Sequence, residues 1–93
     1  MTTEEMKQSS YQSIKDELEK AFASGAMPNV KGFKKVIASL KKRMKLVESG
    51  TSFFARSQED VTRAELAVAR LSGQLQAYQE KLNMITEKLK QNE

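Results

Sequence analysis

Seven cationic side chains lie between residues 31 and 45, and no carboxylate interrupts them. Ammonium and guanidinium groups at this density attract the phosphates of a nucleic-acid backbone or the carboxylates of an acidic protein surface. Only one of the seven is an arginine, the residue that reads guanine through two hydrogen bonds, so the cluster favours charge readout over base readout. The candidate binding residues are Lys31, Lys34, Lys35, Lys41, Lys42, Arg43 and Lys45.

The rest of the chain offers little for catalysis. It has no His and no Cys, which removes common metal ligands and the commonest acid–base catalyst near neutral pH. Glu59 and Asp60 are adjacent acids at an expected helix start, where the helix dipole favours acids regardless of chemistry. The segment SGAMPNVKG lacks the glycine spacing of a phosphate-binding loop. We therefore expect a protein that is not an enzyme and uses no metal and no cofactor.

Phe53 and Phe54 are consecutive aromatic residues in the segment TSFFARS, which we predict to be a loop. Two adjacent rings do not easily point into one core. One interpretation is that a ring plugs the end of a helical bundle. The other is that the pair is an exposed anchor for a partner.

Three helical segments must position these side chains, at about residues 3–24, 30–49 and 58–91. Apolar residues recur at spacings of 3 and 4 in each segment, and no strand-like alternation of useful length interrupts them. The fold class is therefore all-α, a small bundle of about three helices in a single domain. Capping residues predict the helix starts, and glycines predict two of the ends. These residues are Thr2 with Glu5, Asn29, Ser57 with Asp60, Gly25 and Gly50.

The 58–91 segment carries the strongest signal, an apolar stripe from Val61 to Leu89 that alternates spacings of 3 and 4 over four heptads, as in coiled coils. This helix should extend about 50 Å, against about 30 Å for each of the other two. Short loops favour antiparallel neighbours, so we expect the second helix to lie along the first and the third along the second. The stripe would then lack a cover beyond Leu75. We predict that it forms the interface of a homo-oligomer, with the number of subunits left open. The predicted interface residues are Leu75, Tyr78, Leu82, Ile85 and Leu89.

A second set of residues on the same helix includes three small ones. Its members, Leu66, Ala69, Gly73 and Ala77, lie away from the main stripe at spacings of 3, 4 and 4. Alanine is simply a good helix former, but a glycine inside a helix costs about 1 kcal/mol relative to alanine. The set indicates either a second face for close helix packing or helix propensity alone.

The excess positive charge is confined to one segment of the chain. The whole chain of 93 residues has a net charge of +4, whereas residues 31–45 alone carry +7, residues 1–30 carry −2 and residues 46–93 carry −1. No apolar run is long enough for a membrane span and the N-terminus lacks an apolar signal core, so we expect a cytoplasmic protein.

Four interpretations of the basic helix remain open. The first is binding of a nucleic-acid backbone without strong sequence specificity. The second is docking on an acidic protein surface, as an adaptor, scaffold, chaperone or inhibitor would do. The third, a membrane surface, is the least favoured because the apolar side of this helix is needed by the bundle. The fourth is a solvated face, partly offset by the acids Asp16, Glu17 and Glu19 of the 3–24 helix.

Overall fold

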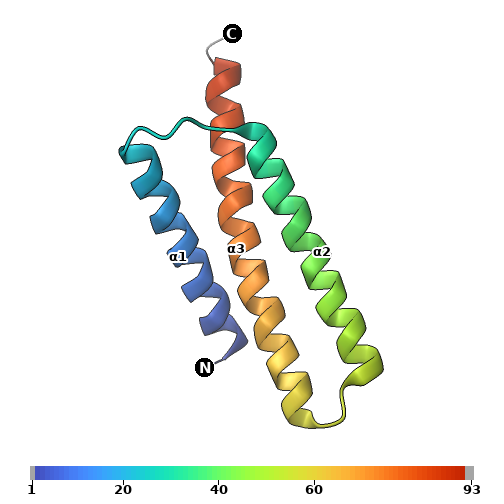
Figure 1. Cartoon of the computed structure of the whole chain (residues 1–93). Helices are drawn as coiled ribbons and strands as arrows, with labels where there is room; N and C mark the ends of the chain where they lie inside the picture. The colour runs from blue at the N-terminus through green and yellow to red at the C-terminus, as the bar shows by residue number, and fades with distance from the viewer. Residues whose placement is uncertain (1, 92–93) are drawn as a thin grey trace.

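The computed structural model describes residues 2–91 and contains three helices within that range: α1 (Thr3–Ala23), α2 (Val30–Phe54) and α3 (Gln58–Gln91). The predicted all-α class is confirmed, since these residues form a three-helix bundle. Figure 1 shows α3 lying between the other two helices, with the 24–29 connection crossing from the end of α1 to the start of α2. α1 therefore runs parallel to α3, and α2 runs antiparallel to it.

The helix ends follow the capping residues of the sequence. The backbone N–H of Glu5 donates to Thr2 Oγ1 over 3.1 Å, and the backbone N–H of Gly32 donates to Asn29 Oδ1 over 3.0 Å. At the start of α3 the backbone N–H of Asp60 donates to Ser57 Oγ over 3.2 Å. Each bond satisfies a donor that the first helical turn leaves without a backbone partner. Gly25, with a φ of 98°, follows the end of α1 in the left-handed conformation that glycine adopts at low cost.

The small face of α3 is a packing face, and α1 occupies it. Ala69, Gly73 and Ala77 are buried. A Cβ atom at Gly73 would lie 2.2 Å from the carbonyl oxygen of Lys7, so the α1 backbone rests directly on this glycine. The expected pairing of the first two helices was therefore wrong, because α1 and α2 both pack on α3 and no Cα of one lies within 8 Å of a Cα of the other.

Gly73→Ala is expected to lower the free energy of unfolding by about 1 to 3 kcal/mol, the usual cost of overpacking a closed contact. In an open helix the same change would be stabilising. The matched control is Gly50→Ala within α2, where an added Cβ meets nothing within 4 Å. That variant should gain up to about 1 kcal/mol. Urea unfolding measures both, and a gain for Gly73→Ala would show that α1 does not pack on Gly73.

Three aromatic rings join the helices near the C-terminal half of α3. The rings of Phe22 on α1 and Phe33 on α2 stack with centroids 6.4 Å apart. The ring of Tyr78 on α3 meets Phe33 edge-on at 5.9 Å. Phe33 is buried together with Ile37 and Leu40, which confirms the apolar side of α2 expected from its spacing. This cluster connects α1 to α2 through side chains although their backbones stay apart.

The long apolar stripe of α3 is covered within the monomer, so the premise of the predicted oligomer interface was wrong. Leu75, Tyr78 and Leu82 are half-buried, and Ile85 is only 8% exposed. Of the five predicted interface residues, Leu89 alone is exposed, at 55%. The homo-oligomer itself stays a prediction, and Leu89 is the most exposed of its five proposed contacts.

Two features of the helices explain this cover. α2 has 25 residues, about five more than expected, so it follows α3 for about 37 Å. α1 lies further along α3, with Lys7 opposite Gly73 and with Phe22 bordering the same hollow as Ile85. The two helices together reach the region that the sequence-based arrangement left open.

The predicted end of α2 at Gly50 was also wrong, because the helix continues to Phe54. Gly50 is helical here, and glycine ends a helix only when it adopts the left-handed conformation found at Gly25. The hydroxyl of Thr51 donates to the carbonyl oxygen of Val47 over 2.8 Å, and the chain turns extended only at Ala55. The predicted loop TSFFARS is reduced to its last three residues, 55–57.

A hydrogen bond from the Tyr11 hydroxyl to the Glu80 carboxylate also joins α1 to α3. This bond holds the proton on the phenol, and partial desolvation adds to the effect, so the pKa of Tyr11 is raised above its ordinary value. The neutral phenol is therefore the form that links the two helices at neutral pH.

Candidate functional site

The packing of α2 determines which of its sides faces solvent. Phe33, Ile37 and Leu40 are buried against α3, so residues on the other side of the helix point away from the bundle. All seven candidate cations are exposed, as the sequence predicted for a polar side opposite the apolar one. We call this set the basic face: Lys31, Lys34, Lys35, Lys41, Lys42, Arg43 and Lys45.

The basic face has an outer row and an inner edge. Lys31, Lys35 and Lys42 are spaced 4 and 7 residues apart, which places them in one row along the outside of α2. Lys34 and Lys41 instead border a shallow hollow against α3, together with Gln79 and Asn83. Sequence reasoning missed these two amides, which follow the stripe residues Tyr78 and Leu82 directly. Their amide groups can donate or accept hydrogen bonds beside the lysines.

No internal acid neutralises the basic face along its own helix. The first carboxylate after Lys31 is that of Glu48. α1, whose acids might offset the charge, packs on α3 and has no backbone contact with α2, and α3 lies between the two (Figure 1). None of the side-chain hydrogen bonds found within residues 2–91 involves one of these seven cations. The face is therefore a concentrated positive charge open to solvent.

Phe53 and Phe54 lie in the last turn of α2 and point into solvent, at 82% and 78% exposed. The interpretation that one ring plugs the end of the bundle was wrong, because the extra turns of α2 carry both rings past the core. Their ring centroids are 6.4 Å apart and their planes are tilted by 57°. The pair is thus available to a partner, as the alternative interpretation required.

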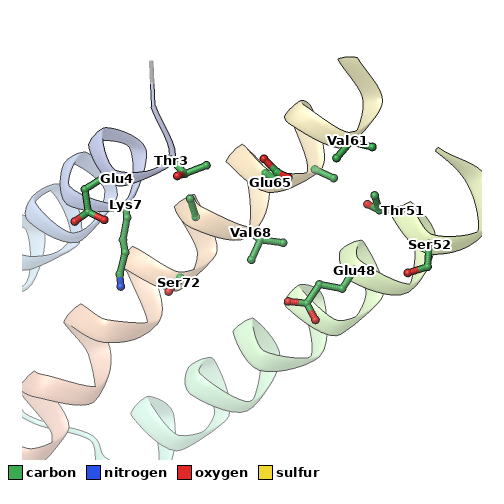
Figure 2. A pocket seen from close by; sticks show the side chains of 12 residues that line it. Thr3, Glu4, Lys7, Glu48, Thr51, Ser52, Val61, Glu65, Val68 and Ser72 are labelled. Atoms are coloured by element: carbon green, nitrogen blue, oxygen red, sulfur yellow. The ribbon is translucent and has the colours of Figure 1, made fainter. Parts of the chain in front are cut away.

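A hollow of about 640 Å³ lies elsewhere, between α1 and α2 over the first half of α3. Figure 2 shows its lining side chains on all three helices, with Lys7 of α1 and Thr51 of α2 on opposite sides of α3. Its carboxylates come from three different helices, through Glu4, Glu48 and Glu65. Within residues 2–91 no three potential metal-binding side chains gather closely enough to hold an ion.

Asp60, at the start of α3, has a structural role. The backbone N–H of Arg56 donates to Asp60 Oδ2 over 3.0 Å, and Ser57 caps the same turn. These bonds close the tight connection between α2 and α3. These two hydrogen bonds give Asp60 a structural role in the connection.

A second apolar hollow of about 350 Å³ lies where the 24–29 connection meets the end of α3. Exposed Met27, Met84 and Leu89 border it, and the ammonium of Lys81 stands 4.9 Å from the centre of the Phe22 ring. Sequence reasoning did not single out Met27, which lies in the 24–29 connection, or Met84, which lies on α3 outside its apolar stripe.

The chain matches no known protein family, no curated protein sequence and no solved structure. No helix within residues 2–91 has the length and apolar character needed to span a bilayer.

Proposed function

We propose that this protein is a non-enzymatic binding protein whose basic face engages the phosphates of a nucleic-acid backbone without strong sequence specificity. One observation carries the proposal: seven exposed cations share one helix with no acid among them. Like charges three or four residues apart destabilise a helix by a few tenths of a kcal/mol per pair. A bound polyanion offsets this repulsion between the cations more strongly than water does.

Phosphate binding fits the composition of the face. Lysine ammonium groups bind phosphate as point charges and need no particular base edge. The outer row of lysines runs along a straight helix at the edge of the bundle, so an extended backbone can follow it. A single arginine, Arg43, leaves little capacity for paired hydrogen bonds to guanine.

The second candidate function is docking on an acidic protein surface through the same face, and the exposed phenylalanine pair favours it. Aromatic residues are frequent anchors at protein interfaces. Competition separates the two functions, since unlabelled DNA of random sequence displaces a nucleic-acid ligand, whereas a complex with an acidic protein that uses both the basic face and the Phe53–Phe54 pair should persist at the same DNA concentration.

The salt dependence of binding tests the proposal. If four or five cations contact phosphates, the logarithm of duplex affinity should fall with the logarithm of salt concentration with a slope of about −4. Lys35→Ala or Lys42→Ala should each reduce the steepness of that slope by about one unit and leave sequence preference unchanged. Fluorescence anisotropy with a labelled duplex measures the slope.

The control for this experiment is Lys90→Ala, an exposed lysine at the end of α3. Its slope should equal that of the unmodified protein. Absence of binding to any nucleic-acid probe at about 50 mM salt would refute the proposal, because charge attraction is strong under that condition.

A further inference from the structure

The end of α2 carries two exposed aromatic side chains, Phe53 and Phe54, that lie outside the basic face. Phe53 lies 11 residues after Lys42, which is three helical turns, so both side chains lie on the same side of α2. Leu46, between them, is exposed as well. The outer row of lysines thus leads to a pair of rings that the fold leaves in water.

The electrostatics of this end differ from those of the lysine row. The last turn of α2 contains no basic residue. The unpaired carbonyls at a helix C-terminus also carry partial negative charge. A phosphate is therefore better placed beside the lysines, whereas the end of α2 offers two uncharged aromatic faces.

We infer that the basic face and the Phe53–Phe54 pair form one binding surface for single-stranded nucleic acid, with phosphates on the lysines and unpaired bases stacked on the rings. This inference rests on the proposed function and adds the class of ligand to it. Proteins that bind single strands combine a cationic track with aromatic side chains in this way, because every base has a π-face. In a duplex the base faces are covered by their neighbours, so the rings would find no partner.

A bilayer fits this surface less well. A helix that lies in a membrane interface buries its whole apolar side in the lipid. The apolar side of α2, with Phe33, Ile37 and Leu40, is already buried on α3. Few large exposed apolar groups remain on the rest of α2, namely Val36, Leu46, Phe53 and Phe54.

The test compares a labelled single strand of about 16 nucleotides, within the site sizes of such proteins, with a duplex of the same sequence. The double variant Phe53→Leu with Phe54→Leu keeps apolar side chains but removes the aromatic faces. It should lose at least about 20-fold in affinity for the single strand, from about fivefold or more for each ring. Its affinity for the duplex should stay within about twofold, and its salt slope should not change, because no charge is altered.

A direct readout of stacking is also available because the chain contains no tryptophan. Phe53→Trp places a single indole at the site. Its fluorescence should be quenched when the single strand is added and should change little with the duplex. Circular dichroism should show unchanged helicity for both variants, since both positions are exposed.

Three outcomes would overturn the inference. If the double leucine variant binds the single strand as tightly as the unmodified protein, the rings do not stack on bases, while the phosphate-binding proposal stands. If the rings matter only for vesicles of anionic phospholipid, and leucine replaces them there, they are a lipid contact. If neither nucleic acid binds at low salt, the proposed function and this inference fall together.

Discussion

Phe33→Ala is expected to lower the free energy of unfolding by about 3 to 5 kcal/mol, the range for truncating a core phenylalanine. The ring of Phe33 is buried, stacks on Phe22 and meets Tyr78 edge-on. It therefore contacts both other helices, and its removal leaves a cavity where the three meet. A chain of this size has a total stability of only about 5 to 14 kcal/mol, so the loss is a large share of it.

The matched control is Phe53→Ala. It removes the same atoms from the same helix, but from a ring that is 82% exposed. Its change in unfolding free energy should stay within about 0.5 kcal/mol. Urea unfolding followed by circular dichroism measures both variants, and similar losses for the two would mean that the core is not organised around Phe33.

Reversing two charges in the outer row, Lys35→Glu with Lys42→Glu, should lower duplex affinity at 50 mM salt by at least about 100-fold. The estimate follows from counterion release. Each phosphate contact contributes about 15-fold at 50 mM relative to 1 M salt, so losing two costs about 200-fold before any repulsion is added. Both residues are exposed, so helicity should be preserved. Fluorescence anisotropy measures the duplex affinity, and circular dichroism measures the helicity.

The control for charge reversal is Lys88→Glu with Lys90→Glu, two exposed lysines in the last turn of α3. Each Lys→Glu change removes two units of charge, so both double variants lower the net charge from +4 by four units, to 0. Only the α2 variant should lose binding. Equal losses would show that the affinity depends on bulk charge and that the basic face has no special role.

The sequence by itself determined the local features of this protein. Thr2, Asn29 and Ser57 cap the helices as predicted, because a cap depends on residues three positions apart. The buried side of α2 and its exposed cations were also predictable. A helix of known period places its apolar residues on one side whatever packs against it.

The tertiary structure alone decided which helix covers which side of α3. The small residues around Gly73 indicated a close contact but did not identify its partner, and α1 takes that place. With α1 there and α2 five residues longer than expected, the stripe that indicated an oligomer is covered inside the monomer.

The two phenylalanines show the same limit of local reasoning. The sequence did not show that α2 continues through Gly50 to Phe54. This continuation places Phe53 and Phe54 in the last turn of the helix, where both rings are exposed. Periodicity fixes the direction in which a side chain points from its own helix. The partner it meets there depends on the free energy of burying all three helices together, which no single segment contains.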